Sequence, residues 1–254
     1  ENEIRSYSYL ATYYLAFNVR KKIFKDPLIR KAIQLSLQPD ELPGILQGGQ
    51  LPAKGFIPPG MLLYPSSFQP KPSLYNARGS LQQAGYPQGR EFPTLDIWIN
   101  PFDGAHRLGE YLKAHLKNTL GIQSHIHLDS SIAFQKALNE NQADLFVRHW
   151  GADYPDESNF FDIFHSKSKI HNTGWINQEY DQLLEKASNE TDLSLRLELY
   201  RMTESVLLQK DPLILPLFYR KNSIILGPKL SKKLTGFELT PLNYLYLRHV
   251  RPAL

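Results

Sequence analysis

The sequence predicts an α/β fold built on a βαβαβ unit with surrounding helices. Between residues 94 and 150, short β-branched and aromatic runs alternate with longer segments whose apolar residues recur at helical spacing. Such alternation is typical of parallel strands joined by right-handed crossovers. A loop with two carboxylates, an aromatic residue and a proline follows the last strand. Ligands of open α/β sheets bind at such strand ends, so we expect a binding cleft there.

Ahead of this unit the sequence predicts a strand, three helices and an irregular loop. Asp26 can cap the first helix, and Pro27 suits its first position because the amide missing there loses no partner. Dense prolines and glycines predict the loop at residues 51–72. In order, we expect the strand at residues 9–19 and helices at residues 26–37, 40–46 and 74–84.

The βαβαβ unit and the segments after it follow the same two periodicities. In the unit, we expect strands at residues 94–99, 123–128 and 143–149 and helices at residues 105–119 and 131–140. Trp150 and Gly151 break the last strand pattern. Ser130 or Ser131 reads as a helix N-cap. Beyond the unit, we expect helices at residues 158–164, 178–187 and 192–209 and strands at residues 213–219 and 223–226.

The loop at residues 152–156, ADYPD, carries the candidate chemistry. Asp153 lies between the aromatic residues Trp150 and Tyr154, where its carboxylate can accept charge-assisted hydrogen bonds from an ammonium group. The alternative is that Asp153 and Asp156 are turn residues around Pro155, where aspartate is common, and spacing alone favours it. We expect Asp156 to be structural.

Residues 149–161, HWGADYPDESNFF, resemble the strand-loop-helix segment of the family 5 extracellular solute-binding proteins, the peptide-binding components of bacterial ABC importers. Other segments are similar to that family in the same order, from about Tyr9 to Val250. They read YLAFN, FKDPLIRKAI, LQQAGYP, GWINQEYD and DPLILPL.

The resemblance implies a periplasmic-binding-protein-like (class II) lobe. Members of the family are much longer than this chain, so we expect a C-terminal fragment. Residues 1–18 are then a crossover strand from the missing first lobe, and residues 19–218 are the second ligand-binding lobe. Residues 219–254 are a return segment whose C-terminal strands run back toward the first lobe.

The resemblance also implies the function and the site. A peptide is held between two lobes by hinge closure for uptake by an ABC transporter. Asp153 takes its α-ammonium group, Trp150 gives an apolar wall, and His106 matches a histidine that faces the ligand in oligopeptide-binding relatives. The candidate ligand-binding residues are Asn100, His106, Arg148, Trp150, Gly151, Ala152, Asp153, Tyr154 and Trp175.

One position departs from the family pattern. Oligopeptide binders carry an arginine three residues before the tryptophan, where this chain has Val147, and Arg148 follows on the opposite face of the strand. The accepted peptide length and the ligand class therefore stay open. The alternatives are a binder of another small solute, such as a nickel chelate, and the ligand-sensing domain of a transcription regulator with a DNA-binding head.

Partners and location follow from the same resemblance. We expect a monomer that binds a peptide ligand and meets ABC permease subunits in the membrane. The expected location is periplasmic or anchored to the cell envelope, with any export signal removed or absent from this sequence, because no basic-then-apolar leader precedes the first strand.

Composition limits the other function classes. The 254 residues are 42% hydrophobic, enough for one or two cores, and no run of about 18 apolar residues occurs. The net charge of +4 comes with only short basic clusters, so we expect no nucleic-acid partner. The absence of cysteine excludes disulfides.

Motifs for catalysis and metal binding are also missing from the sequence. His125 and His127 share one strand face, but two imidazoles without a third donor do not make a zinc site. No nucleophile elbow, phosphate-binding glycine loop or HExxH motif occurs. We therefore expect no catalytic residues, no metal and no cofactor.

Overall fold

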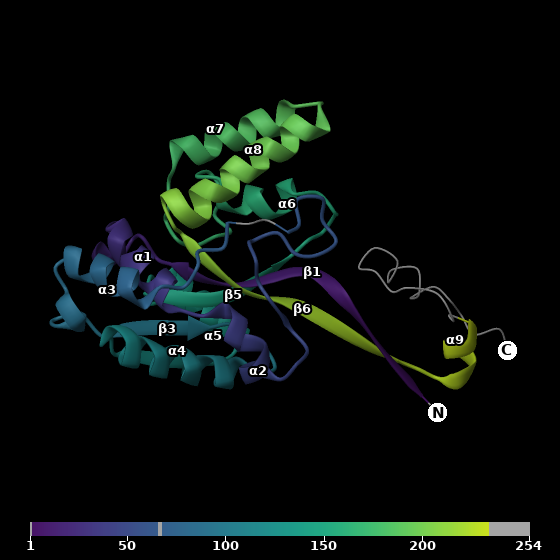
Figure 1. Ribbon diagram of the computed structural model, residues 1–254, viewed down its shortest axis with the longest axis horizontal. Helices are drawn as coiled ribbons and strands as arrows, with labels where there is room; N and C mark the ends of the chain where they lie inside the picture. The colour runs from purple at the N-terminus through teal and green to yellow at the C-terminus, as the bar shows by residue number, and fades with distance from the viewer. Residues whose placement is uncertain (1, 66–67, 234–254) are drawn as a thin grey trace.

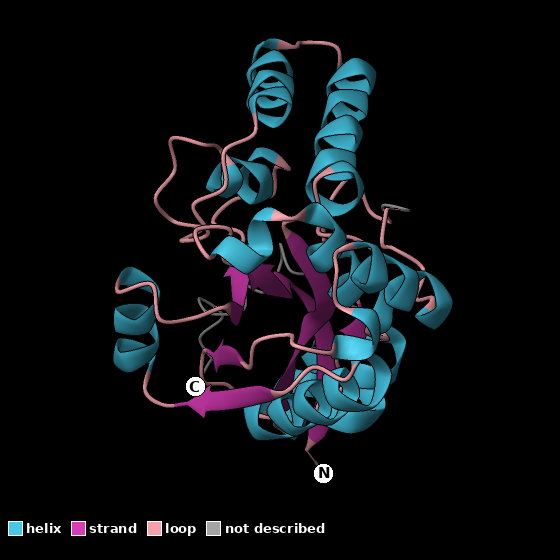
Figure 2. Ribbon diagram, turned by 90° about the vertical axis from the view of Figure 1, so that its left-hand side faces the viewer, coloured by secondary structure: helices cyan, strands magenta, loops and turns pink. Residues whose placement is uncertain are grey.

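The computed structural model describes residues 2–65 and 68–233, which form a mixed sheet with helices on both faces (Figures 1 and 2). The strand order across the described six-stranded sheet is β2-β6-β1-β5-β3-β4. The strands are β1 Glu3–Phe17, β2 Leu51–Pro52, β3 Leu95–Ile99, β4 Ser124–Leu128, β5 Leu145–Gly151 and β6 Ile214–Leu226. The α-helices are α1 Pro27–Ser36, α2 Leu42–Leu46, α3 Leu74–Gln83, α4 Ala105–Leu120, α5 Ser131–Asn139, α6 Ser158–Phe161, α7 Gln178–Asn189, α8 Leu193–Ser205 and α9 Pro228–Lys233.

The predicted βαβαβ unit is confirmed as β3-α4-β4-α5-β5. β3 lies in the middle and pairs in parallel with both β4 and β5. Its carboxyl end and that of β5 therefore lie at one edge of the sheet, as the alternation predicts.

Side-chain caps begin several of the helices. Asp26 accepts from the Leu28 amide at 2.9 Å, with Pro27 in the first turn, as predicted. Ser130, rather than Ser131, caps α5 by accepting from the Ala133 amide at 3.2 Å. The helix predicted at residues 192–209 is regular to Ser205 and continues as a π-helical turn at Val206–Lys210.

Three strand predictions are wrong in their bounds. The strand predicted at residues 9–19 is β1 Glu3–Phe17, because its first residues pair with the end of β6. β5 does not end before Trp150 but runs through Gly151, because Thr12 and Ala11 of β1 pair with these two residues. β6 is one continuous strand rather than two, because Asn222 and Lys221 pair with β1 across the predicted gap. All three errors arise from pairing between segments far apart in the sequence.

β1 and β6 continue beyond the rest of the sheet as a two-stranded antiparallel ribbon that leads toward α9 (Figure 1). The division of the chain into crossover strand, ligand-binding lobe and return segment stays a prediction. The strands expected between residues 236 and 250 lie outside the described residues. No described helix has both the length and the apolar character needed to cross a membrane.

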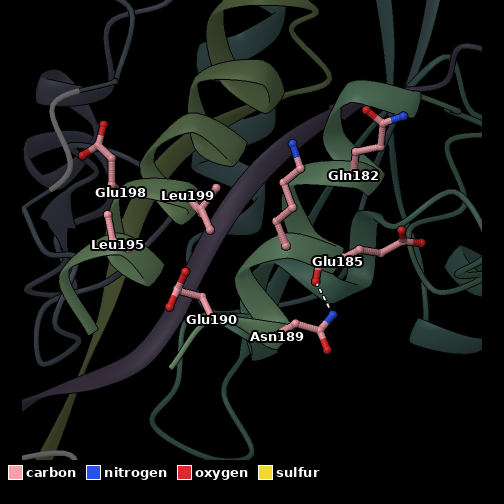
Figure 3. Close-up of a pocket in the computed structure, with 8 residues that line it drawn as sticks. Gln182, Glu185, Asn189, Glu190, Leu195, Glu198 and Leu199 are labelled. Atoms are coloured by element: carbon pink, nitrogen blue, oxygen red, sulfur yellow. Dashed lines mark hydrogen bonds between the residues drawn. The ribbon is translucent and has the colours of Figure 1, made fainter. Parts of the chain in front are cut away.

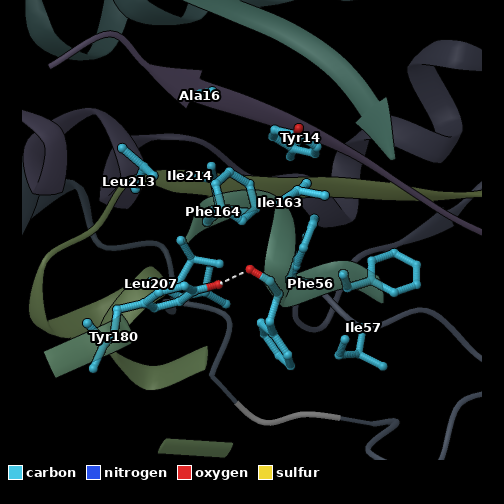
Figure 4. Close-up of a cluster of buried hydrophobic side chains, with 14 of the residues drawn as sticks. Tyr14, Ala16, Phe56, Ile57, Ile163, Phe164, Tyr180, Leu207, Leu213 and Ile214 are labelled. Carbon is cyan, nitrogen blue, oxygen red and sulfur yellow. Dashed lines mark hydrogen bonds between the residues drawn. The ribbon is translucent and has the colours of Figure 1, made fainter. Parts of the chain in front are cut away.

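Each face of the sheet has its own core. One face packs against α1, α3 and α4 through residues such as Ile33, Leu81 and Leu112, and we call this the α4-side core. The other packs against α5, α6, α7 and α8 and against the proline-rich loop at residues 53–63, and we call it the α8-side core (Figure 4). Successive β5 side chains point alternately into the two cores, which determines what faces the strand end.

Candidate functional site

The candidate site begins where β3 stops and β5 continues. Pairing between the two strands ends at Ile99 and Val147, and the Asn100 amide makes the last bond, to the Val147 carbonyl at 2.9 Å. Beyond it, the described residues pair β5 only with β1. Because successive backbone groups alternate in direction along a strand, those of His149 and Gly151 face away from β1, along this free edge.

A hollow of about 430 Å³ lies beside the free edge of β5. Its volume falls in the range of small-ligand pockets. It is bordered by Tyr9, Asn100, Ser131, Phe134, Gln135, Arg148, His149, Trp150, Gly151, Asp153 and Arg220. The hollow therefore collects residues from β1, β5, β6 and α5 and from the loops after β3 and β5.

Five of the nine predicted site residues border this hollow: Asn100, Arg148, Trp150, Gly151 and Asp153. Asn100 also brings an unused hydrogen-bond acceptor. Its Oδ1 is buried and has no partner among the described residues. A buried amide oxygen without a partner is costly, so a ligand N–H at this point would be stabilised.

Asn159 of α6 fixes the geometry of the loop. Its buried side-chain oxygen accepts from the Trp150 indole nitrogen at 3.0 Å and from the Asp153 amide at 3.3 Å. The indole and the loop backbone are thus held together, while the Asp153 side chain is exposed at the hollow. The sequence analysis did not include Asn159 among the site residues. The signal that could have identified it is its position in the phenylalanine-rich segment directly after the loop.

Asp156 is structural, as expected. Its carboxylate oxygens lie 2.9 Å from the Arg196 guanidinium of α8, and one of them also accepts from the Ser158 amide. Partial burial acts to raise the pKa of Asp156, but hydrogen bonds from Ser158 and the charge of Arg196 outweigh it and lower the pKa. The two aspartates of the loop therefore differ, because only Asp153 borders the hollow.

Tyr154 and Ala152 lie in the loop but do not border the hollow. Tyr154 is half-exposed, and its hydroxyl lies 3.4 Å from the Ser158 hydroxyl. The Ala152 amide donates to the Leu10 carbonyl at 2.8 Å, and its methyl group packs against the α8-side core.

His106 and Trp175 are not brought to the hollow. His106 lies exposed in the first turn of α4 and is absent from the hollow's border. Trp175 is 3% exposed, and its indole nitrogen donates to Asp211 at 2.7 Å. It borders a separate hollow beside Arg20 and Gly174. Trp175, the tryptophan of the GWINQEYD segment, therefore packs into the α8-side core.

Val147 and Arg148 face opposite sides of β5, as their alternation predicts. Val147 is fully buried in the α4-side core, whereas Arg148 borders the hollow and donates to the Ile170 carbonyl at 2.8 Å. Arg148 therefore places a positive charge at the hollow. An arginine at position 147 would project from the opposite face of β5.

Two further basic side chains border the hollow. The Arg220 guanidinium lies over the Tyr9 ring, 5.6 Å from its centroid. His149 stacks on Tyr13 at a ring separation of 4.9 Å. Burial lowers the pKa of His149, and the charges of Arg220 and Arg148 lower it further, so the imidazole is neutral at neutral pH.

Tyr9 and Arg220 were missed because a bulge brings them together. The register of β1 and β6 shifts between the pairs Ser8 with Lys221 and Thr12 with Tyr219, so three residues of β1 oppose Arg220 alone. Bulges re-aim side chains and leave no local signal in composition. The sequence also predicted a gap between two strands at Arg220.

The paired histidines of β4 belong to a polar contact outside the hollow. His127 Nε2 lies 2.8 Å from Asp96 Oδ1, and its ring stacks on Trp98 at 4.6 Å. In the part of the chain that the structure describes, no three metal-ligating side chains are grouped closely enough to hold an ion.

A larger hollow of about 700 Å³ lies between α7 and α8 (Figure 3). It is bordered by Gln182, Glu185, Lys186, Asn189, Glu190, Leu195, Glu198 and Leu199. Half of these side chains are charged, and none of them belongs to β3, β5 or the loops that follow these strands. We therefore place the candidate site at β5 despite the smaller volume there.

His171, beside the Ile170 carbonyl that holds Arg148, gives a pH-dependent prediction. It is 4% exposed, its Nδ1 lies 2.5 Å from the Thr173 hydroxyl, and its Nε2 has no partner among the described residues. Burial, the largest contribution, lowers the pKa of His171 to about 4, while the unfolded chain protonates near 6.5. The stability that this neutral histidine contributes is complete above pH 6.5 and is lost as the pH falls toward 4.

We expect the free energy of unfolding to fall by about 3 kcal/mol from this residue as the pH falls through that range. Urea unfolding at a series of pH values measures it. In the His171→Asn variant this part of the pH dependence should disappear. The control His125→Asn, at a side chain 70% exposed, should keep it. Equal pH profiles for wild type and His171→Asn would contradict the prediction.

The mixed sheet with helices on both faces is the fold of a solute-binding protein. The chain belongs to the bacterial extracellular solute-binding proteins, family 5: the family description "Bacterial extracellular solute-binding proteins, family 5 Middle" matches residues 1–172. The family is one of binding proteins rather than enzymes.

Curated relatives are similar along almost the whole chain. The periplasmic oligopeptide-binding protein OppA of Salmonella typhimurium is 27% identical over 98% of this chain and 46% of its own length. The dipeptide-binding protein DppE of Bacillus subtilis is 25% identical over 93% of this chain and 44% of its own length. The chain therefore spans slightly less than half the length of these relatives.

Solved structures confirm the fold. The substrate-binding domain of an oligopeptide ABC transporter from Bacillus anthracis has a TM-score of 0.79 and 26% identity, covering 89% of this chain and 47% of that one. Haemophilus influenzae OppA, solved in complex with the peptide RPPGFSPFR, also has a TM-score of 0.79, with 23% identity over 89% of this chain and 46% of that one.

Proposed function

We propose that this chain forms the part of an ABC-importer solute-binding protein that binds a peptide along the free edge of β5. The observation that carries the proposal is that β5 continues past the last β3 pair beside a hollow. A peptide in extended form adds there as a strand, and its main-chain hydrogen bonds to His149 and Gly151 do not depend on its sequence. The peptide-binding names of OppA and DppE support this ligand class.

In this arrangement Asp153 takes the α-ammonium group of the peptide. Its carboxylate is exposed at the hollow, while Asn159 holds the loop backbone and the Trp150 indole in place. A charge-assisted hydrogen bond from the ammonium group then fixes one end of the peptide, and the indole offers an apolar wall.

The proposal extends to the whole protein. A second lobe closes over the peptide by a hinge motion, and the loaded monomer delivers it to permease subunits from the periplasm or the cell envelope. OppA and DppE are both named as binding proteins, and these names do not favour the alternative of a transcription regulator. Other relatives carry different ligand names, including a probable deoxycholate-binding protein of Escherichia coli, so the ligand class itself requires a test.

Calorimetry on the full-length protein tests the proposal. We expect free-amine peptides of two to five residues to bind, and Asp153→Asn to weaken them by about 10- to 100-fold through loss of one charge-assisted contact. N-acetylated peptides, which lack the ammonium group, should bind wild type and Asp153→Asn alike.

Asp103→Asn is the matched control, because Asp103 is an exposed aspartate of the loop after β3 that does not border the hollow. It should leave affinity within about twofold of wild type. If wild type bound no peptide, or if Asp153→Asn bound free amines as tightly as wild type, the proposal would fail.

A further inference from the structure

A second hollow, of about 420 Å³, lies at the other end of α5 from the hollow beside β5, and we call it the Arg20 hollow. It collects residues from the segment after β1, from the end of α5 and from the loop at residues 166–176. Ser131, in the first turn of α5, borders the hollow beside β5, whereas Asn139, the last residue of α5, borders the Arg20 hollow. No described residue borders both, so the two hollows are separate.

The border of the Arg20 hollow carries positive charge. Arg20 and Lys169 are its two cationic side chains, and none of the residues that border it has a carboxylate. Asp181 and Asp211 lie behind the border, where each accepts a hydrogen bond from one of the bordering residues. Among the described residues, neither of these carboxylates forms an ion pair with Arg20 or Lys169. The border therefore favours an anion.

Neutral side chains of the border have used their acceptors and keep their donors. Asn139 Oδ1 accepts from two side chains, at 3.1 and 3.3 Å, while its Nδ2 donates to none of the described residues. The hydroxyl oxygens of Ser166 and Ser168 each accept from a backbone amide at 3.2 Å. Each of these side chains therefore has an N–H or O–H group left for an incoming acceptor.

Asn172 brings the donors of Arg20 and Asn139 close together. Its carbonyl accepts from Arg20 Nη2 at 2.9 Å, and its side-chain nitrogen donates to Asn139 Oδ1 at 3.3 Å. Arg20 Nη2 also donates to the carbonyl of Leu138, the residue directly before Asn139, at 2.9 Å. The guanidinium is thus held by neutral carbonyls beside Asn139, and its Nη1 makes no hydrogen bond with the described residues.

Gly174 permits the close packing of the loop against Arg20. Its φ of +73° lies in the left-handed region that favours glycine, and an added Cβ would clash with the Arg20 side chain. The stem of Arg20 therefore lies directly against the loop backbone. Contacts from the loop and from the end of α5 together fix the position of the guanidinium at the border.

From this arrangement we infer that the Arg20 hollow binds a phosphate group, with Arg20 and Asn139 as direct donors and Lys169 adding positive charge. A phosphate offers several strong acceptor oxygens, which suit a guanidinium beside neutral N–H and O–H donors. The group has two sources, inorganic phosphate and the headgroup of an anionic lipid. Ile176, 78% exposed at the border, would meet the apolar part of a lipid.

Calorimetry on the full-length protein, at an ionic strength held constant with chloride, tests inorganic phosphate. We expect saturable binding by wild type, weakened about tenfold or more in Asn139→Asp. This substitution keeps the acceptor for Gln135 and Asn172 but replaces the free donor with a negative charge. The control Asn76→Asp adds the same charge at an exposed position of α3 that does not border the hollow, and should stay within about twofold of wild type.

A matched pair of lysine variants tests the charge at the border. Lys169→Gln should weaken phosphate binding by about threefold, the effect of one exposed charge. Lys167→Gln removes the same charge two residues earlier, at an exposed side chain that does not border the hollow, and should have a smaller effect. Equal effects of the two variants would contradict a role for Lys169 at the border.

Vesicle sedimentation tests the headgroup source. Full-length protein is mixed with vesicles of phosphatidylglycerol and phosphatidylcholine, or of phosphatidylcholine alone. Binding to the mixed vesicles that Asn139→Asp reduces and Asn76→Asp keeps would assign the site to a lipid headgroup. Binding of inorganic phosphate without vesicle binding would assign it to the free ion.

The phosphate site and the peptide site can fail separately, because they share no bordering residue. Absence of binding in both arms, or binding that Asn139→Asp leaves unchanged, would overturn the phosphate site. Asp153→Asn should not alter phosphate binding, and Asn139→Asp should leave peptide affinity within about twofold of wild type. Circular dichroism and urea unfolding of each variant show whether a loss of binding arises from a loss of folding.

Discussion

Phe56→Ala is expected to lower the free energy of unfolding by about 3–5 kcal/mol, the range for truncating a buried phenylalanine. The Phe56 ring is fully buried in the α8-side core (Figure 4). Its centroid lies 5.5 Å from Tyr14, 5.3 Å from Phe160 and 5.4 Å from Phe164, in edge-to-face contacts. Truncation removes all three contacts and leaves a cavity between β1 and α6.

The backbone at Phe56 explains why the site cannot collapse to fill that cavity. Its amide donates to the buried Glu204 carboxylate at 2.6 Å, and its carbonyl accepts from the Thr12 hydroxyl at 2.8 Å. These bonds hold the proline-rich loop against β1 and α8. Because Phe160 neighbours Asn159, loosening this core should also weaken the hold on Trp150 and Asp153, and so reduce peptide affinity.

Urea unfolding measures the predicted change. Phe56→Leu, which keeps most of the buried volume, should cost about 1–2 kcal/mol. Tyr75→Ala, at an aromatic side chain 88% exposed, should stay within about 0.5 kcal/mol of wild type. A loss below about 1 kcal/mol for Phe56→Ala would show that the loop is not part of the cooperative core.

The βαβαβ unit was predictable because its signals are local. Apolar residues recur at helical spacing through α4, and β3 alternates buried and half-buried residues, with Leu95, Ile97 and Ile99 facing the core. The proline-rich loop was predicted only as irregular. Its contribution of Phe56 and Ile57 to the α8-side core depends on contacts with distant segments, which no short pattern encodes.

The residues of the candidate site also fall into two groups, those that local patterns predict and those that distant contacts place. Asn100 directly follows β3, Trp150 lies near the end of β5, and Asp153 follows it. Because the periodicity identifies both strands, the meeting of these residues at one sheet edge could be predicted. Arg220 could not, because a bulge in β1 decides where it lies. Trp175 lies away from the hollow because Asp211, a residue far along the chain, accepts its indole N–H.

Asp211→Ala is expected to cost about 3–5 kcal/mol, because it leaves a buried charge without its partner. Arg30 of α1 is 3% exposed and pairs with Asp211, and its Nε donates to the Pro212 carbonyl at 2.7 Å. Burial lowers the pKa of Arg30, with Asp211 opposing that effect. The second Asp211 oxygen accepts from Trp175 and Asn177, so truncation also leaves these two donors unpaired.

A double-mutant cycle with Arg30→Met distinguishes a broken ion pair from general damage. Arg30→Met removes the buried charge together with its desolvation, and Asp211, one-third exposed, keeps its bonds to Trp175 and Asn177. We expect this single variant to cost less than Asp211→Ala, and the double variant to cost less than the sum of the two. Glu179→Ala, which breaks the exposed pair with Lys210, is the control and should stay within about 0.5 kcal/mol. Strictly additive losses in urea unfolding would show that Asp211 acts only through Trp175 and Asn177, so that the junction of α1 with the start of β6 does not depend on the charge pair.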